Sequence, residues 1–398
     1  MKKLSVQLIG VATLLAATGP LVAQVPDSSH IYAYPPVRIS DRPQNPAGPI
    51  GILPVQFKAA YGFNRIPNLG QGQTIALVDA GDDPNIESDL AVYQAQFHLT
   101  PCNFQKVKVG NPTGNPGWGL ETSLDVEQAC ALAPQSNILL VEANSQSIAD
   151  LLAAVQVASS SPYNATVVSM SWGYPDFSGE QQYDSYFCNI VAGNGQPVTF
   201  LAAAGDAAHH VLYPSASPCV IAVGGTTLTL AEAAPLANPL QLNYGAEIGW
   251  SHTGGGVSAY ESQMSWQNPA CATWSTTNRC TPDIASVAAN IPVYSTYGNN
   301  GWVNVDGTSI GTPDWAAFIT IVNSQRAALS KGTLSQAAYD LYQFYYSGNY
   351  LTDFHDITTG SNGTCGSQCN AGPGFDLLTG IGTYQADLLI TPLVFATN

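Results

Sequence analysis

Short apolar runs alternate along the chain with longer stretches in which apolar residues recur at helical spacing. Continuous apolar runs are typical of strands that are buried on both faces, and the stretches between them are typical of amphipathic helices. The pattern predicts an α/β fold with a mostly parallel central sheet flanked by helices. The expected strands are 74–79, 137–141, 166–170, 198–203 and 219–223, and the expected helices are 86–97, 121–132, 148–158, 183–191, one after Thr308 and one over 335–346.

The N-terminal region divides into two parts before this pattern begins. Two lysines, an apolar stretch broken at Gly19-Pro20, and a small residue at Ala23 predict a secretory signal peptide over residues 1–23. A membrane anchor is the alternative, and the short run and its helix-breaking residues argue against it. Residues 24–47 are rich in proline and polar residues, which predicts an extended leader or linker. Residues 48–398 are expected to form one domain.

Charged residues are rare. The chain has 398 residues with 11 Lys+Arg and 27 Asp+Glu, a net charge of −16, and only 10% charged residues, against about 25% in typical soluble proteins. The hydrophobic content of 45% argues against a disordered acidic chain. The lack of basic segments argues against nucleic-acid binding. No later segment is apolar enough to span a bilayer, so no membrane association is expected after signal cleavage.

Cysteine usage fits an oxidising compartment, either extracellular or periplasmic. All eight cysteines follow residue 23, and an even number in an exported chain favours disulfides. Zinc is not expected, because the six histidines do not cluster with the cysteines and no paired CxxC motif occurs. Proximity in sequence favours two pairs, and elimination gives the other two: Cys271–Cys280 and Cys365–Cys369, then Cys102–Cys130 and Cys188–Cys219.

One candidate nucleophile stands at the start of a predicted helix. In Gly307-Thr308-Ser309, a serine follows a glycine turn, where backbone N–H groups and the positive end of the helix dipole are in reach. This placement suits a nucleophile whose transition state is an oxyanion. The alternative is an ordinary helix N-cap.

Three carboxyl groups are the candidate partners of this serine. Glu121 and Asp125 are four residues apart, so they lie one turn apart on one helix face and their titrations couple. The alternative is a solvated acidic helix start. Asp206 follows an apolar strand and Gly205, which directs it to the carboxyl edge of the sheet. A turn-capping aspartate is its alternative.

Together these motifs resemble those of the sedolisins, the serine-carboxyl peptidases with a subtilisin-like fold. The resemblance extends from about Gly51 to Thr383, and further stretches match in the same order. Any one of the motifs is weak, but their number and order make chance agreement very unlikely. The additional matching stretches are 168–173, 213–218, 223–228, Trp250, 254–258 and 281–284.

The resemblance implies a three-layer subtilisin-like fold and a catalytic role for each candidate. Ser309 would be the nucleophile and Glu121 the general base, with Asp125 orienting Glu121. Asp206 would stabilise the oxyanion together with the backbone N–H of Ser309. A monomer acting on peptides or unfolded proteins is expected, and the substrate-binding residues would be Ser171, Trp172, Gly173, Gly254 and Gly255.

These roles require opposite protonation states in similar groups. Glu121 must be ionised to accept a proton, whereas Asp206 must be protonated to donate to the oxyanion. Because both residue types have ordinary pKa values near 4, the two states coexist in acid or where the environment separates the pKa values. The sequence therefore predicts an acidic optimum and a loss of activity near neutrality.

A second constellation lies near the C-terminus. Asp356 and Asp376 are separated by glycine-rich turns, which offer the hard oxygen ligands that Ca²⁺ requires. A pair of capped turns is the alternative. The resemblance implies one calcium ion, completed by water, with the ligands Asp356, the Ile357 carbonyl, the Gly372 carbonyl, the Gly374 carbonyl and Asp376.

Two features depart from the family pattern, and two other functions compete with a peptidase. Sedolisins usually carry a large folded pro-domain, whereas the leader of about 24 residues is too short for one. Ala207-Ala208 stands where the family often has Ser-Gly.

A secreted non-catalytic binding protein on the same scaffold is one alternative function, although all four chemical positions are filled. A glycosidase is the other, but the serine would have no role in it. Both endopeptidase and tripeptidyl-peptidase activity remain open.

Overall fold

The computed structural model of the chain describes residues 28–231 and 244–397. The predicted signal peptide, residues 1–23, lies outside the described residues, as does the start of the predicted leader. In the described part of the chain, no helix is both long and apolar enough to cross a membrane.

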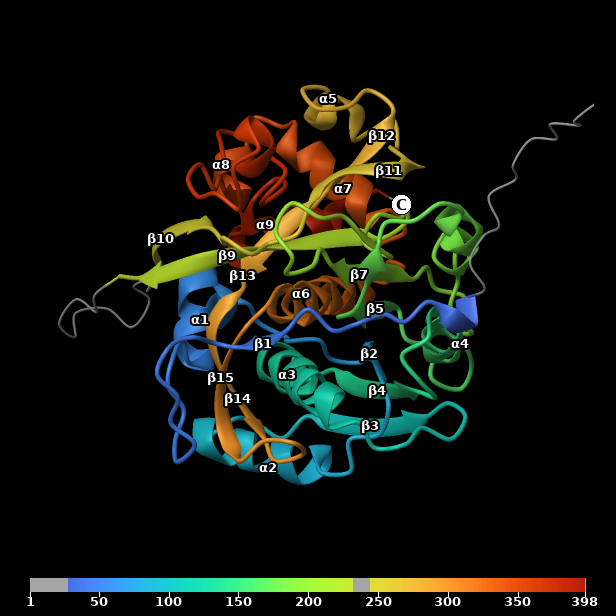
Figure 1. The fold of residues 1–398 in the computed structure, drawn as a ribbon, viewed down its shortest axis with the longest axis vertical. Helices are drawn as coiled ribbons and strands as arrows, with labels where there is room; N and C mark the ends of the chain where they lie inside the picture. Colours follow the sequence, from blue (N-terminus) through green and yellow to red (C-terminus); the bar gives the residue numbers. More distant parts are fainter. Residues whose placement is uncertain (1–27, 232–243, 398) are drawn as a thin grey trace, which may run out of the picture.

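The core of the molecule is an eight-stranded sheet in the order β10-β9-β7-β5-β2-β4-β3, with β13 also paired to β9 (Figure 1). All neighbouring strands are parallel except β10, which runs antiparallel to β9. The sheet is therefore mostly parallel, as the sequence predicts. Its strands are β2 (Thr74–Ala80), β3 (Asn103–Lys108), β4 (Asn137–Ala143), β5 (Val167–Met170), β7 (Thr199–Ala203), β9 (Ile221–Leu230), β10 (Tyr244–Gly249) and β13 (Ile284–Val287).

Helices cover both faces of this sheet. Along β2, Ile75 and Leu77 belong to a core shared with α3 and α6, whereas Ala76 and Val78 belong to a second core shared with α4. Alternation between two cores confirms the predicted three-layer α/β architecture. The described helices are α1 (Pro54–Tyr61), α2 (Ile86–Phe97), α3 (Pro116–Leu132), α4 (Ile148–Ser159), α5 (Asn268–Cys271), α6 (Thr308–Ala328), α7 (Ala337–Tyr345), α8 (Tyr350–Asp353) and α9 (Ala386–Phe395).

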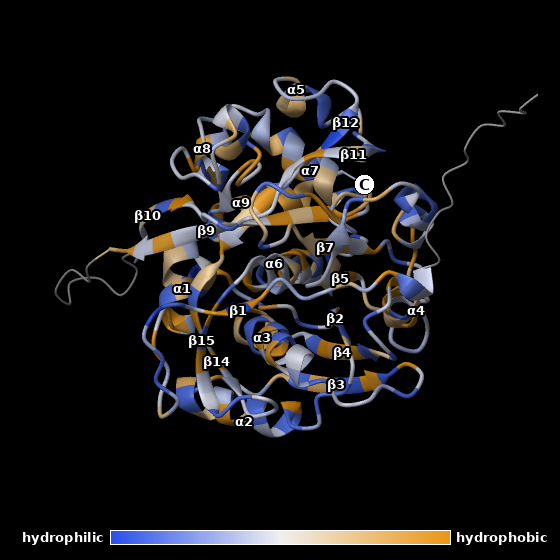
Figure 2. Cartoon of the chain, in the orientation of Figure 1, coloured by the Kyte–Doolittle hydropathy of each residue, from blue (hydrophilic) through white to orange (hydrophobic). Residues whose placement is uncertain are grey.

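All five predicted strands are present, as β2, β4, β5, β7 and β9, and five of the six predicted helices are α2, α3, α4, α6 and α7. Their apolar runs appear as hydrophobic stretches within the fold in Figure 2. The helix predicted over 183–191 is wrong. This region holds a short 3₁₀ helix, η3 (Glu180–Tyr186), because Phe187 packs on Phe200 and Tyr213 and Cys188 is bonded to Cys219.

Strands outside the central sheet complete the described fold. β14 (Ala289–Ser295) and β15 (Gly301–Asp306) form a hairpin whose outer partner is β1 (Arg38–Ile39) from the leader. The remaining short elements are β6 (Tyr174–Pro175), β8 (Leu212–Tyr213), β11 (Gly256–Ser262), β12 (Asn278–Thr281), β16 (Phe354–His355), β17 (Thr383–Tyr384), η1 (Ser28–His30), η2 (Phe63–Arg65) and η4 (Gly366–Cys369).

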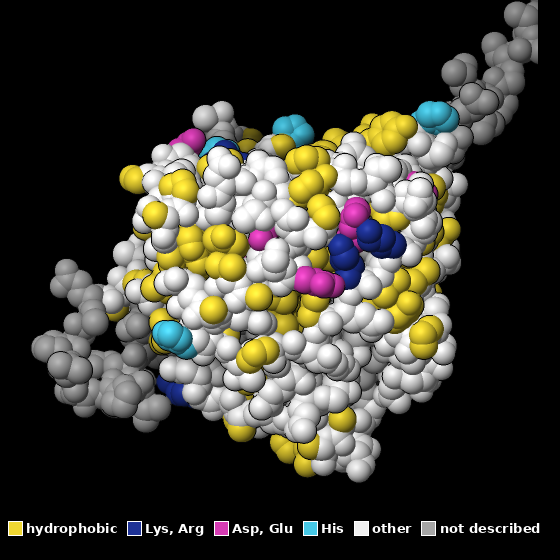
Figure 3. All heavy atoms as spheres, turned by 90° about the horizontal axis from the view of Figure 1, so that it is seen from below, with side chains coloured by type: hydrophobic (Ala, Val, Ile, Leu, Met, Phe, Trp, Pro, Cys, Tyr) yellow, Lys and Arg dark blue, Asp and Glu magenta, His cyan; other side chains and the backbone are white. Residues whose placement is uncertain are grey.

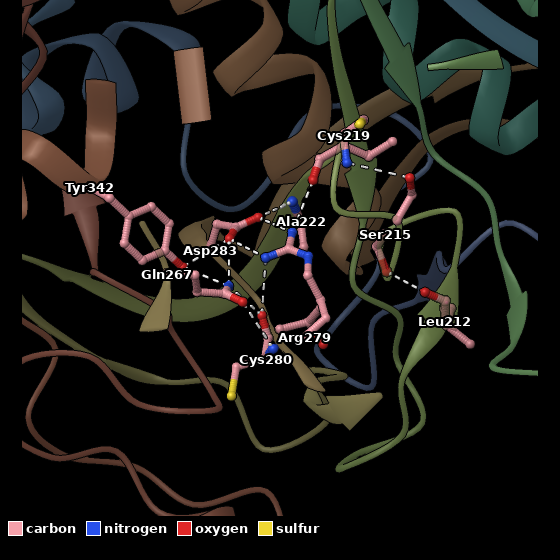
Figure 4. A network of polar contacts seen from close by, with 12 residues as sticks. Leu212, Ser215, Cys219, Ala222, Gln267, Arg279, Cys280, Asp283 and Tyr342 are labelled. Atoms are coloured by element: carbon pink, nitrogen blue, oxygen red, sulfur yellow. Dashed lines mark hydrogen bonds and ion pairs between the residues drawn. The ribbon is translucent and has the colours of Figure 1, made fainter. Parts of the chain in front are cut away.

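A buried ion pair joins β12 and α7 to the central sheet (Figure 4). The guanidinium of Arg279 contacts Asp283 through two hydrogen bonds of 2.7 and 2.6 Å, and both side chains are only 1% exposed. Asp283 also accepts from the backbone N–H of Ala222 at the start of β9, and from the hydroxyl of Tyr342 on α7. Bidentate geometry and these further donors offset the cost of burying the charges. The 281–284 motif therefore has a structural role, because Asp283 connects β12, β9 and α7.

The cysteines and the surface agree with the sequence analysis. All eight cysteines are paired, and the four predicted disulfides are confirmed: Cys102–Cys130, Cys188–Cys219, Cys271–Cys280 and Cys365–Cys369. Charged side chains are sparse on the face seen in Figure 3, where most of the surface is uncharged.

Candidate active site

Helix α3 carries two of the candidate carboxyl groups into the protein interior. The helix begins at Pro116, because the side chain of Asn115 accepts a hydrogen bond of 3.1 Å from the Gly117 N–H and caps it. Glu121 and Asp125 therefore lie in the second and third turns, and both are fully buried. A solvated acidic helix start is excluded for this pair.

Ser309 lies against these carboxyl groups at the start of α6. The two helices pack on each other, and the Ser309 side chain is fully buried. Among the described residues, its hydroxyl has no hydrogen bond of good geometry. The hydroxyl is nevertheless close enough to the Glu121 carboxyl to lower the pKa of Glu121. Loose geometry of this kind is common in a catalytic pair before substrate binds. The structure thus brings together the serine and the base that the sequence predicts.

Burial and mutual repulsion keep protons in this cluster. The pKa of Glu121 is well above its usual range, first because of burial and then because of Asp125 and Asp79. The pKa of Asp125 is also well above its usual range, mainly through burial, although the Ser171 hydroxyl donates to it at 2.8 Å. Asp79, at the end of β2, is a third buried carboxyl whose pKa burial raises to about 8. The three groups therefore hold fewer than three negative charges.

Asp206 comes just after β7 and lies against the start of α6. Its carboxyl accepts hydrogen bonds of 2.9 Å from both the N–H and the hydroxyl of Thr308. The same hydroxyl accepts from the Gly205 N–H at 3.1 Å, so this carboxyl is fixed relative to the start of α6. Burial raises the pKa of Asp206 to about 8, while Thr308 and Arg38 act in the opposite direction. The group is protonated throughout the acidic range.

Position 307, two residues before Ser309, requires a glycine because its backbone lies close to Asp206 and Pro36. A Cβ atom built on Gly307 would lie 3.1 Å from the Asp206 Oδ2 atom and would collide with the Pro36 carbonyl oxygen. Both oxygens therefore border the same small space beside the Ser309 N–H. A side chain at this position would fill that space.

The predicted substrate-binding residues occupy three different positions. Ser171 and Trp172 face inward: the first donates to Asp125, and the indole of the second donates to the Val78 carbonyl at 2.9 Å. Gly173 lies beside the leader and forms hydrogen bonds with Tyr34. Gly254 and Gly255 are buried behind Asp206, where the N–H of Gly254 donates to the Gly205 carbonyl at 2.6 Å.

Sequence reasoning gave no role to three features of this site. Asp79 falls at the end of the predicted strand 74–79, but its place in the carboxyl cluster depends on burial. Thr308 was read as part of the serine motif, although its N–H and hydroxyl hold Asp206. The leader was read as a linker, although it reaches the Ser309 N–H. A prolyl carbonyl carries no recognisable signal in a sequence, so this contact could not be predicted.

The two aspartates among the predicted calcium ligands both bind the turn that contains Gly372 and Gly374. Both oxygens of Asp356 accept from the Gly374 N–H at 3.1 Å, and Asp376 accepts from the Gly372 N–H at 3.0 Å. Asp376 also accepts from the N–H groups of Leu378 and Thr379, and burial raises its pKa to about 6. The turn over residues 372–376 thus holds both carboxyl groups.

Comparisons with known proteins agree on one family. Residues 113–341 match the model of the subtilase family. Kumamolisin from Bacillus sp. is 31% identical, over 85% of this chain and 62% of its own length. Sedolisin from Pseudomonas sp. is 27% identical, over 84% of this chain and 60% of its own length. This chain therefore spans about three fifths of the length of these two relatives.

A solved structure gives the same result. Pseudomonas sedolisin, a serine-carboxyl proteinase complexed with two molecules of pseudo-iodotyrostatin, superimposes with a TM-score of 0.73 and 26% identity. The match covers 87% of this chain and 98% of that chain. The chain belongs to the subtilase family, and within it to the sedolisins.

Proposed function

We propose that this protein is a serine-carboxyl peptidase that hydrolyses peptide bonds in peptides or unfolded proteins. Ser309 is the nucleophile, Glu121 the general base and Asp125 the group that orients Glu121. Asp206 and the backbone N–H of Ser309 stabilise the oxyanion. The observation that carries this proposal is that Ser309 is buried beside Glu121 of α3, while its neighbour Thr308 binds a separate carboxyl group, Asp206, whose pKa is raised to about 8.

The chemistry follows from these positions. Glu121 takes the proton of the Ser309 hydroxyl as Oγ attacks the substrate carbonyl carbon. Negative charge develops on the carbonyl oxygen, where the Ser309 N–H and the Asp206 O–H donate to it. Glu121 then gives its proton to the leaving amine, and the C–N bond breaks. Water, activated by Glu121, hydrolyses the resulting ester and restores the serine hydroxyl.

The mechanism needs two protonation states, a protonated Asp206 and an ionised Glu121. Asp206 has a pKa of about 8 and stays protonated in acid. Glu121, Asp125 and Asp79 all have raised pKa values, so the form that accepts the serine proton, with one of the three ionised and the others neutral, is reached as the pH rises above the usual carboxyl range. Activity is expected in acid and is lost as the pH rises through the pKa of Asp206, since an ionised Asp206 repels the oxyanion.

Glu121→Gln tests the proposed base. The amide has the same shape but cannot accept the serine proton, so kcat is expected to fall by about 10²- to 10⁴-fold. The matched control is Glu127→Gln, on the same helix and also fully buried, where the side chain accepts from the Tyr294 N–H at 3.0 Å. Initial rates on a denatured protein at pH 4 measure both. Equal activity of Glu121→Gln and wild type would refute the assignment.

The same assay separates the peptidase from the binding protein on the same scaffold, which would show no hydrolysis at any pH. The comparisons give no support to that alternative. Secretion into an extracellular or periplasmic space belongs to the proposal, and the four disulfides are consistent with it. Cleavage after residue 23 stays a prediction, since those residues lie outside the described part.

We further propose that Asp356, Asp376 and the carbonyls of Ile357, Gly372 and Gly374 hold one calcium ion. The donor set fits, because two carboxyl groups meet at one turn and all five donors are oxygens. Within residues 28–231 and 244–397, no lysine or arginine forms a salt bridge with either carboxyl group. A cation would supply the missing charge and stabilise the C-terminal layer.

Removing calcium is therefore expected to lower the melting temperature by several degrees. A ligand present at 100 times its Kd contributes about 2.7 kcal/mol to stability. Melting curves with calcium and with a chelator measure the effect, and metal analysis counts the ion. Asp376→Asn should abolish the response to the chelator. Asp353→Asn, a buried aspartate outside the proposed ligand set, should keep it. A wild-type protein without bound calcium would refute the site.

A further inference from the structure

Two loops that are far apart in the sequence bring a histidine to a disulfide. One ring nitrogen of His209 and the Sγ atoms of Cys365 and Cys369 lie within 4.8 Å of one another. The structure thus brings together the ligand types whose separation in the linear sequence argued against zinc. Among the described residues, the buried Nδ1 atom of His209 has no hydrogen-bond partner. A buried ring nitrogen of this kind is unfavourable unless a ligand completes it.

The backbone around His209 is strained. Ala208 and His209 both have a φ of 38°, a conformation that costs free energy for residues with a Cβ atom. Two backbone hydrogen bonds of 3.0 Å hold the loop in place, from the Ala208 N–H to the His252 carbonyl and from the Gly255 N–H to the His210 carbonyl. The loop therefore keeps the His209 ring at a fixed position at a cost in free energy, as is common at functional sites.

The segment that carries the two cysteines is anchored to the same part of the chain. The Asn362 side-chain amide donates to the Thr253 carbonyl at 2.8 Å, and the Asn362 N–H donates to the Cys369 carbonyl at 3.0 Å. Cys369 is thus fixed, and it is buried with an exposure of 1%. Cys365 is exposed, and a Cβ atom built on the next residue, Gly366, meets nothing within 4 Å. One sulfur is therefore held in place, and the other has room to move.

This disulfide is the most accessible one to a reductant. Among the eight cysteines, all of which lie in the described part of the chain, Cys365 alone is exposed, and thiol–disulfide exchange depends on access to the sulfur that is attacked. The bond closes a sequence separation of 4, against 9, 28 and 31 for the other three disulfides. A short closed loop restricts the unfolded chain least, so the fold should persist when this bond is open.

We propose that His209, Cys365 and Cys369 form a metal site that becomes available when the disulfide is reduced, and that it binds a thiophilic divalent cation such as Zn²⁺. A dithiol reductant supplies two electrons and two protons, the S–S bond breaks, and the reductant becomes a disulfide. Zn²⁺ then displaces the two thiol protons and binds both thiolates and the imidazole, with water as the fourth ligand. Zn–S bonds of about 2.3 Å require the two sulfurs to separate to about 3.8 Å, and the exposed Cys365 side has room for this movement.

The ligand set selects the metal. Two thiolates and an imidazole suit Zn²⁺, whereas the carboxylates and carbonyls of the proposed calcium site suit a hard cation. Burial, and then the neighbouring His210, lower the pKa of His209, so its ring is neutral near pH 7 and can bind a metal. No residue of the proposed peptidase mechanism is a ligand, so this site is independent of the proposed function.

Metal binding to Ser309→Ala protein tests the site without any contribution from hydrolysis. The protein is reduced with a dithiol at pH 7, desalted under nitrogen into excess calcium, and titrated with Zn²⁺ or with Co²⁺, whose bonds to thiolates absorb light. One ion per reduced chain is expected, and none per oxidised chain. His209→Ala should raise the Kd by at least about 10-fold, because it removes a ligand. The matched control, His210→Ala, should leave the Kd unchanged, since the His210 Nδ1 atom already lies 2.6 Å from the Ala207 and Ala208 carbonyl oxygens.

Alkylation locates the bound ion and needs no further variant. Zn²⁺ should protect Cys365 and Cys369 of the reduced protein from iodoacetamide, and peptide mass spectrometry identifies the modified cysteines. Absence of protection, protection of other cysteines instead, or an equal Kd for His209→Ala and its control would overturn the site. A protein that unfolds before these two cysteines become reactive would also overturn it, because the disulfide would then not open in the folded chain. Absent hydrolysis by the wild type would instead count against the peptidase and leave these results unchanged.

Discussion

Replacing Ser309 with alanine is expected to lower kcat/KM for peptide hydrolysis by at least about 10⁴-fold, because the change removes the atom that we propose attacks the carbonyl. The fold should be unaffected. Ser309 is fully buried, and within the described structure its hydroxyl forms no hydrogen bond of good geometry. Initial rates at pH 4 and a melting curve, measured on the same preparation, separate loss of chemistry from loss of folding.

A second serine on α6 provides the control for this substitution. Ser324 is 3% exposed, and its hydroxyl donates to the Asn68 carbonyl at 3.4 Å, remote in sequence from the start of the helix. Ser324→Ala should keep full activity. Suppose instead that Ser309→Ala retains a few per cent of the hydrolysis and shows the same response to an inhibitor as wild type. That result would mean that another residue is the nucleophile.

The sequence was sufficient for the parallel sheet, because each central strand is a continuous apolar run. The sequence was not sufficient for strand segments that are short or that contain polar residues. β9 continues through Thr226 and Thr227 to Leu230, yet only its apolar beginning was recognised. The hairpin of β14 and β15 contains prolyl and asparaginyl residues and is stabilised by tertiary contacts, among them β1 of the leader. Local patterns do not encode such partners.

The candidate site, like the fold, was only partly predictable from the sequence. Residue types and spacing made Ser309, Glu121, Asp125 and Asp206 candidates, and the resemblance to the sedolisins gave each its predicted role. Their burial could not be read from sequence, because it depends on α3 starting at Pro116 and packing on α6. The position of the leader depends on pairing with Gly173, more than a hundred residues away in sequence. Non-local contacts of this kind decide which carboxyl groups keep their protons.

The buried carboxyl groups also predict how stability depends on pH. Burial raises the pKa values of Asp79 and Glu261 to about 8 and that of Glu142 to about 7. Burial also places the pKa of Asp314 well above its usual range. The folded state therefore keeps protons that the unfolded chain releases near pH 4. Because the folded state binds more protons between these values, the free energy of unfolding falls as the pH rises from about 4 to 8.

Urea unfolding at pH 4, 6 and 8, with the calcium concentration fixed, measures this dependence. Each proton held in excess by the folded state contributes a slope of about −1.4 kcal/mol per pH unit. Asp314→Asn isolates one such group, since the amide is neutral at every pH, and the Ser286 hydroxyl contacts the carboxyl it replaces at 3.4 Å. The variant and wild type should be similarly stable at pH 4 and diverge toward pH 8, where the variant is more stable. A wild-type protein that became more stable between pH 4 and 8 would instead require these carboxyl groups to be ionised and paired. The sparse cations leave little for such pairing, because the buried ion pair of Arg279 with Asp283 already uses one of the 11 Lys+Arg residues.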